Sequence, residues 1–262
     1  MPGPERLAGT IRRMTIRYDA LTTPDAYPDV FKVPAPAELG ERRIKPRKPG
    51  YMIRLAPQAA MEGAAAESAG LAATAGDTAT PERERERELL QVQWGLVPHW
   101  VKSASDGRLR APKLVNARSE TVTTSTPFRD AWLQGQRCIV PMQAFYVDDL
   151  RSGKPVATRI ARIDGATLGV AGLWARWTGP DGDTLLSFTL LTVNANSHAL
   201  LHRYGQPGSE KRMPAILSEG THAAWLAAPV AKAGEFMRAF AAQSLTANPV
   251  ETKADKVRDR LV

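Results

Sequence analysis

The feature of this sequence that most restricts its fold is a series of short apolar segments in its second half, separated by turn residues. Gly-containing turns fall between several of them, as at Asp164-Gly165 and at residues 179–182. Short apolar runs between such turns are typical of β-strands. The runs cover residues 137–141, 144–147, 158–163, 168–177 and 185–193. The sequence therefore predicts an α+β fold built on an antiparallel or barrel-like β-sheet.

Helical patterns are fewer, lie mainly at the C-terminal end, and predict helices at the periphery of the sheet. Residues 128–133 have an apolar helical face, on which we expect Trp132 to pack against the sheet. Residues 221–226 and 233–243 predict two further helices. The apolar residues Phe236, Met237 and Phe240 would share one face of the last helix.

The length of 262 residues is enough for one domain with a substantial core. Residues 58–80 are rich in Ala, Gly, Glu and Thr, and residues 81–88 alternate Glu and Arg. Such composition is typical of a solvated segment rather than of a binding surface. We therefore expect a single domain over residues 1–262, with an insertion at 58–88 and a peripheral charged tail at 251–262.

The charge balance favours polyanionic partners. Lys and Arg number 35 against 27 Asp and Glu, which gives a formal net charge of +8. Cys138 is the only cysteine, so no intramolecular disulfide can form, and no Cys and His spacing resembles a zinc site. We expect no metal and no other cofactor. An apolar run of transmembrane length and a signal-peptide core are both missing, which predicts a cytoplasmic protein without membrane contact.

Two compact motifs between residues 91 and 121 are candidates for a binding surface: Trp94-Gly95-Leu96-Val97-Pro98-His99-Trp100 and Asn116-Ala117-Arg118-Ser119-Glu120-Thr121. A strand ending at Gly95 would bring Trp94 and Trp100 to a rim, and Asn116 and Arg118 would lie near each other. Exposed rings beside an arginine form a platform for single-stranded nucleic acid, because bases stack on the rings and phosphates pair with the charge. The alternative is a buried tryptophan and a structural ion pair of Arg118 with Glu120 or Asp130.

An ordered series of six motifs resembles the SOS response-associated peptidase family. The motifs follow one another in the family's order over residues 90–217. They are Trp94-Gly95-Leu96-Val97-Pro98 with Trp100, the Asn116 motif through Thr121, Arg137-Cys138-Ile139-Val140-Pro141 with Phe145-Tyr146, Ala171-Gly172-Leu173-Trp174, Thr192-Val193-Asn194-Ala195-Asn196 and Lys211-Arg212-Met213-Pro214. The resemblance implies binding to single-stranded DNA and reaction with abasic sites.

The resemblance also implies a set of site residues. Family members expose an N-terminal cysteine, whose amine and thiol form a thiazolidine with the ring-opened abasic sugar. The asparagine of the Asn-Ala-Arg motif, here Asn116, orients the nucleophile, and the arginine, here Arg118, holds phosphate. A glutamate after Phe-Tyr and a histidine before Arg-Met-Pro manage the protons.

This sequence departs from that pattern at the catalytic positions. Position 2 is Pro2, which has an amine but no thiol, and Val147 stands where the family has the glutamate. Asp148 follows, but on a strand it would face the opposite side. The segment before Arg212 is longer than in the family, and His202 is the nearest candidate for the histidine. Cys138 lies in an apolar strand and is not expected to be a nucleophile.

Three functions fit these observations. The first is non-covalent binding of single-stranded or abasic DNA through Trp94, Trp100 and Arg118, with the covalent cysteine chemistry lost. The second is an enzyme in which the Pro2 amine forms an iminium with an abasic site, assisted by Asn116 and His202. The third is a protein-binding module that reuses the fold. The sequence alone does not separate them.

Overall fold

The computed structural model describes residues 17–57 and 85–250. Most regular structure in these residues is β-strand. The strands are β1 (Tyr18–Asp19), β2 (Arg43–Ile44), β3 (Pro49–Leu55), β4 (Arg87–Trp94), β5 (Asn116–Arg118), β6 (Arg137–Met142), β7 (Ala144–Asp149), β8 (Val156–Arg162), β9 (Leu168–Thr178), β10 (Thr184–Asn194), β11 (Arg212–Pro214), β12 (Ile216–Leu217) and β13 (Leu245–Pro249).

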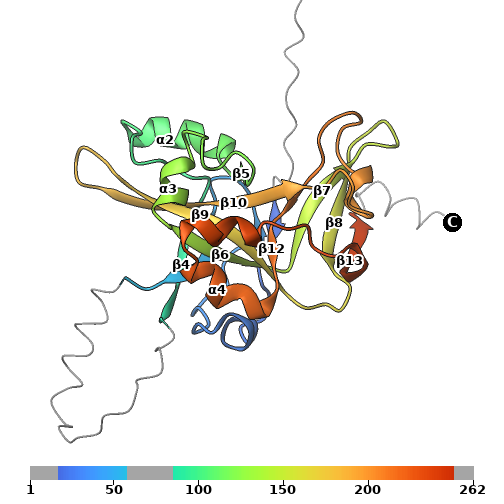
Figure 1. Ribbon diagram of the computed structural model, residues 1–262, viewed down its shortest axis with the longest axis horizontal. Helices are drawn as coiled ribbons and strands as arrows, with labels where there is room; N and C mark the ends of the chain where they lie inside the picture. The colour runs from blue at the N-terminus through green and yellow to red at the C-terminus, as the bar shows by residue number, and fades with distance from the viewer. Residues whose placement is uncertain (1–16, 58–84, 251–262) are drawn as a thin grey trace, which may run out of the picture.

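The helices of the same residues are short. They are α2 (Ala104–Arg110), α3 (Arg129–Leu133), α4 (His222–Ala227) and α5 (Val230–Ala233), with single turns at η1 (Tyr27–Phe31), η3 (Ala111–Lys113), η4 (Leu201–Arg203), η5 (Glu219–Thr221), η6 (Gly234–Phe236) and η7 (Ala242–Ser244). Figure 1 shows α2, α3 and α4 on the outside of the strands. None of the helices in the described ranges is long and apolar enough to span a membrane.

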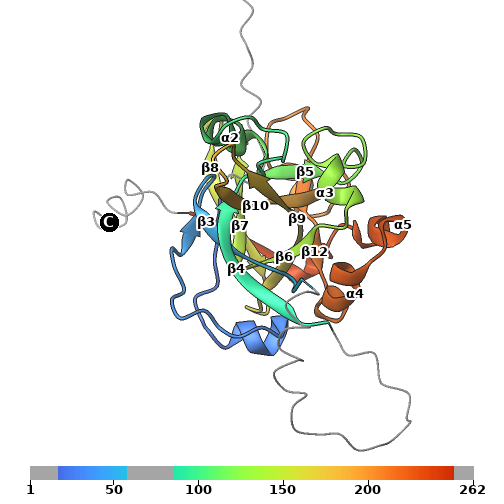
Figure 2. The same ribbon diagram turned by 90° about the vertical axis from the view of Figure 1, so that its left-hand side faces the viewer.

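Strands β4, β3, β6, β9 and β10 pair in that order, and β10 returns to pair with β4, so the sheet closes into a barrel (Figure 2). The β9–β10 hairpin closes it, with pairs from Thr184 opposite Thr178 to Leu190 opposite Gly172. The β4–β10 pair is parallel, and the other pairs around the ring are antiparallel. The predicted α+β class with a barrel-like sheet is confirmed.

A second sheet adjoins the barrel, with the strand order β13-β8-β7-β1-β2. Only Gln143 separates β6, which belongs to the barrel, from β7, which belongs to this sheet. The two sheets are therefore joined almost without interruption along one stretch of chain. A second link is made by the loop after η4, where the Gly205 amide donates to the Asp148 carbonyl of β7 at 2.7 Å.

The predicted helix over residues 233–243 is wrong. The chain forms α5 and the turn η6 as far as Phe236, and Met237 then leaves helical geometry with φ −84° and ψ 72°. The Phe236 ring packs edge-on against Trp225 of α4, with centroids 5.7 Å apart. The apolar pattern therefore reflects packing of a short, irregular segment, because tertiary contacts override a weak helical pattern that contains Gly234.

The start of β4 also differs from the sequence prediction. The expected insertion extended to Glu88, but Arg87 and Glu88 already pair with Leu55 and Arg54 of β3. Arg54 Nε donates to Glu88 Oε1 at 2.6 Å, so the end of the charged run is part of the sheet.

Candidate nucleic-acid interface

Asn116 and Arg118 lie on the same face of β5, as their spacing predicts. The strand pairs in parallel with β10, with Asn116 opposite Leu190 and Arg118 opposite Thr192. Ala117 between them is fully buried, whereas Asn116 is half-buried and Arg118 is exposed. β10 therefore holds the Asn-Ala-Arg motif with Arg118 at the surface and Asn116 half-buried, its side-chain oxygen being buried.

Arg118 forms an ion pair, as the structural alternative expected, but its partner is Glu210 and neither Glu120 nor Asp130. Its Nη1 lies 2.9 Å from Oε2 of Glu210, while 60% of its side chain stays exposed. Glu120 turns instead to Arg212, and Asp130 lies beside His99 and Arg129. Glu210 was not singled out from the sequence, although it stands two residues before Arg212 and so on the same side of an extended chain.

Arg212 lies behind Arg118 and is buried, with 7% of its side chain exposed. Its two terminal nitrogens donate to both oxygens of Glu120, at 3.0 and 2.7 Å. Nη1 also donates to Glu210 Oε1 at 2.8 Å, and Nη2 to the Thr192 carbonyl at 2.6 Å. We call Arg118, Glu210, Arg212 and Glu120 the arginine–glutamate network. Its two positive and two negative charges balance.

Glu120 is ionised in this network. Partial burial raises the pKa of its carboxyl, but the hydrogen bonds from Arg212 and the Asn194 amide outweigh it and hold the pKa below its ordinary value. The network is therefore an array of paired charges at the C-terminal end of β10.

Trp94 does not lie at a rim, and its predicted stacking role is wrong. The side chain is fully buried inside the barrel, with the Tyr18 ring edge-on at 5.1 Å. Its Nε1 donates to the Val115 carbonyl at 3.0 Å, directly before Asn116. The motif predicts where β4 ends but not to which side the last residue points. Trp94 fixes the start of β5 from within and is not available to a ligand.

Trp100 is partly exposed, at 36%, in agreement with the sequence prediction. The guanidinium of Arg110, in the last turn of α2, lies 5.3 Å from its ring. The residue preceding Trp100, His99, lines a pocket of about 240 Å³ whose other polar residues are Asp130, Gln134, Gln136 and Arg176. Trp100 and Arg110 therefore place an aromatic ring and a cation side by side. A contact of Trp100 with DNA stays a prediction.

Val147 is buried in the core, so β7 places no carboxylate at that position. The neighbouring Tyr146 points to Asp19, which was not anticipated: its hydroxyl lies 3.1 and 3.0 Å from the two Asp19 oxygens. Burial, then the hydrogen bond to Asp19, raise the Tyr146 pKa. The partners lie 127 residues apart, so no local pattern could reveal the pair.

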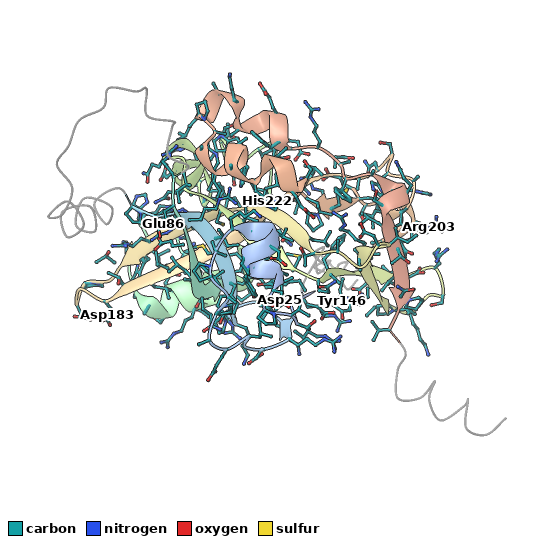
Figure 3. The ribbon with its side chains drawn as sticks, turned by 90° about the horizontal axis from the view of Figure 1, so that it is seen from below. Asp25, Glu86, Tyr146, Asp183, Arg203 and His222 are labelled. Carbon is teal, nitrogen blue, oxygen red and sulfur yellow. The ribbon has the colours of Figure 1, made fainter. Side chains whose placement is uncertain are left out.

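Arginines surround this buried pair. Arg159 Nε donates to Asp19 at 3.0 Å, and Arg43 Nη2 donates to the Tyr146 hydroxyl at 3.1 Å. Arg17 lies over the Tyr146 ring, 4.4 Å from its centre. Two guanidinium groups thus contact one carboxylate, and a third lies over the ring of its tyrosine partner. Figure 3 shows Tyr146 in the same half of the molecule as Arg203 of η4.

His198 and His202 are held by contacts with the backbone. His198 is buried, and its Nδ1 accepts from the amides of Leu200 and Leu201, so its other ring nitrogen donates to the Phe240 carbonyl at 2.8 Å. His202 lies exposed in η4 with Nδ1 2.9 Å from the His198 carbonyl, and its catalytic role stays a prediction. Glu210, not His202, is the titratable residue of this segment that reaches Arg118.

Cys138 is buried, and burial strongly raises the pKa of its thiol, which agrees with its prediction as an inert residue. Pro2 lies outside the described residues. Among those residues, no group of three or more His, Cys, Asp or Glu side chains could hold a metal ion.

The fold is a closed barrel, and its strand β5 carries an Asn-Ala-Arg motif beside paired charges. A family of proteins with this motif matches the chain. The model of the family described as "SOS response associated peptidase (SRAP)" matches residues 14–257. The chain therefore belongs to this family. Pro2 lies before the matched range, so the match does not support placing Pro2 at the position of the family's terminal cysteine.

Known relatives agree with this assignment. The chain is 32% identical over 137 residues to the abasic site processing protein YoaM of Bacillus subtilis. This match covers 52% of this chain and 55% of the relative. It is 29% identical over 199 residues to the abasic site processing protein HMCES of Gallus gallus, covering 66% and 56%. The matches thus span little more than half the length of these relatives.

Solved structures agree as well. A crystal structure of a protein from Bordetella bronchiseptica has a TM-score of 0.74 at 33% identity, covering 90% of this chain and 99% of that one. One from Bacteroides thetaiotaomicron has a TM-score of 0.63 at 20% identity, covering 92% and 94%, and shares the fold.

Proposed function

We propose that this protein binds single-stranded or abasic DNA non-covalently, with Arg118 holding a phosphate and Asn116 facing the sugar. The observation that supports this most is the Arg118 side chain, which is 60% exposed on the same face of β5 as Asn116. An exposed guanidinium held at one end by a strand is suited to a phosphate. Relatives that are named abasic site processing proteins give the abasic site as the substrate class.

Two other features support a polyanionic ligand. On the second sheet, Arg43 and Arg159 contact the Asp19 carboxylate, and Arg17 lies over the adjacent Tyr146 ring. Trp100 offers a partly exposed ring with Arg110 close to it, which suits base stacking. The net charge of +8 acts in the same direction.

The proposal leaves out the covalent step of the family. Val147 is buried where that chemistry uses a carboxylate, and an apolar side chain cannot transfer a proton. A general acid contributes about a hundredfold or more to such reactions. Incubation with abasic single-stranded DNA should give no heat-stable adduct on a denaturing gel, and one that forms without reductant would contradict this part of the proposal. Borohydride in a parallel reaction would trap an iminium from an amine such as that of Pro2.

The binding itself is tested by Arg118→Ala. We expect the variant to bind a labelled single strand at least about tenfold more weakly, since a hydrogen bond to a charged group contributes roughly 1.5 kcal/mol or more. The loss should be similar for different sequences, because a phosphate contact reads no base. Fluorescence anisotropy of a labelled oligonucleotide measures it.

Arg162→Ala is the matched control. Like Arg118→Ala, it removes an arginine that forms an ion pair. The partner is Asp164, on the turn between β8 and β9, and both residues are far in sequence from the Asn-Ala-Arg motif. Equal weakening by the two variants would show that only the total charge matters. Wild-type protein that does not bind at low ionic strength would refute the proposed function.

A further inference from the structure

Arg118 is exposed but already occupied by a carboxylate of the same chain. Glu210 Oε2 lies 2.9 Å from its Nη1, the distance of a charge-assisted hydrogen bond. A phosphate oxygen would approach the same exposed guanidinium. In the structure, therefore, Glu210 lies where a ligand of Arg118 would lie.

Glu210 is held in that position from behind. Its other oxygen, Oε1, accepts from Arg212 Nη1 at 2.8 Å and from Asn194 Nδ2 at 3.1 Å. The next residue is fixed as well, because the Lys211 amide donates to Asn196 Oδ1 at 2.7 Å. Oε1 of Glu210 is thus held by the buried Arg212 and by Asn194 of β10, and Oε2 contacts Arg118.

The charges of the arginine–glutamate network balance without a ligand. Arg212 is already bound by both oxygens of Glu120 and by the Thr192 carbonyl. Glu210 therefore neutralises Arg118 chiefly, and a phosphate that reached Arg118 would lie beside an uncompensated carboxylate. Like charges this close repel unless one of them turns away.

We propose that Glu210 is an internal competitor for the phosphate site, which a DNA strand must displace from Arg118, so that this carboxylate lowers the affinity of the protein for DNA. The inference rests on the proposed function and names a regulation of its site. Displacement is feasible, because 30% of the Glu210 side chain is exposed and residues 206–209 before it are exposed. Oε1 can keep Arg212 while Oε2 releases Arg118.

The test is Glu210→Gln, which keeps an oxygen acceptor for Arg212 and removes the charge. We expect the variant to bind a short labelled thymidine oligonucleotide about two- to fivefold more tightly than wild type, the range that follows from the strength of exposed ion pairs. The slope of log affinity against log salt should also steepen by up to about 0.7, because the phosphate no longer replaces a bound anion.

The matched control is Asp183→Asn, which removes one negative charge at the tip of the β9–β10 hairpin. Figure 3 shows Asp183 at the opposite end of the molecule from Arg203, which precedes the loop to Glu210. The control should leave binding unchanged. Tightening by Asp183→Asn equal to that of Glu210→Gln would overturn the inference, since total charge would explain both.

A double variant isolates the contact itself. Arg118→Ala combined with Glu210→Gln should bind no better than Arg118→Ala alone, because the competitor has lost its target. If wild type binds and Arg118→Ala weakens it, but Glu210→Gln binds equally or more weakly, the inference fails while the proposed function stands. If no variant binds, the proposed function itself fails. Thermal melting checks folding, and Glu210→Ala replaces the Gln variant if that is unstable.

Discussion

At the scale of single residues, His222 makes the stability of the protein depend on pH. The residue, labelled in Figure 3, is buried at the start of α4. Its ring stacks on Phe31, with centroids 5.2 Å apart and an interplanar angle of 6°. Burial, followed by the nearby charge of Arg87, lowers its pKa from 6.5 to about 4. Between these values the unfolded chain binds more protons than the folded one, so the free energy of unfolding falls as the pH drops from 6.5 to about 4.

We expect the loss to be about 3 kcal/mol for wild type, at 1.36 kcal/mol for each unit of pKa difference. His222→Leu should lack this part of the pH dependence, whatever its effect on stability at pH 7. Urea denaturation at pH 7 and pH 4 measures both. His99→Leu changes an exposed histidine and serves as the control; an unaltered pH dependence in the His222 variant would contradict the assignment.

Residue roles were predictable from sequence only where the partner is close along the chain. Asn116 and Arg118 share a face because alternate residues of a strand do, and this needed no structure. Asp19 and Glu210 were missed because their partners, Tyr146 and Arg118, lie far away in sequence. Trp94 was placed wrongly because a strand end allows a side chain to point inward or outward.

At the scale of elements, Gly95 determines how β4 ends. Its φ of 115° belongs to a region that other residues rarely adopt, and a Cβ there would lie 2.5 Å from the Ala111 carbonyl oxygen. The close approach lets the Gly95 amide donate to Phe188 and brings η3 against the barrel. The backbone geometry at the end of β4 therefore requires a glycine at position 95 of the tryptophan motif.

Gly95→Ala should lower the free energy of unfolding by about 3 kcal/mol or more, since backbone strain and a clash with main-chain atoms add. Gly182→Ala is the control: its φ is 84°, but no atom lies within 4 Å of the added Cβ, so only the strain of about 1 to 2 kcal/mol remains. Denaturant unfolding compares them. Equal losses would mean that the contact with Ala111 contributes nothing.

The strands were easier to predict than the helices. Turn residues and short apolar runs mark where strands lie between residues 137 and 193, since both signals are local. The parallel pairing of β4 with β10, which closes the barrel, joins segments about 94 residues apart and leaves no local signal. The helix predicted at 233–243 is absent because its apolar residues pack against the core from an irregular segment, with Phe236 on Trp225.

At the scale of the whole molecule, the net charge of +8 predicts that DNA binding depends on salt. Each phosphate held by an arginine contributes about −0.7 to the slope of log affinity against log salt for a single strand. If Arg118, Arg17 and Arg43 each hold one phosphate, the slope is roughly −2, and shallower by up to about 0.7 in the wild type because the phosphate at Arg118 replaces Glu210. Titrations between about 50 and 200 mM salt measure it. A slope near zero would show that phosphates are not the ligands.

β10 pairs with β9, β4, β5 and β11, and it thereby positions both arginines of the network: Arg118 lies opposite Thr192, and Arg212 lies opposite Asn194. The strand that closes the barrel is thus the strand that spaces the two guanidinium groups. The distance between the backbones of Arg118 and Arg212 is therefore fixed before a ligand binds, and it cannot change without opening the core. On binding, the conformational adjustment therefore falls on the DNA strand and on the side chain of Glu210, and little entropy is lost by the protein backbone.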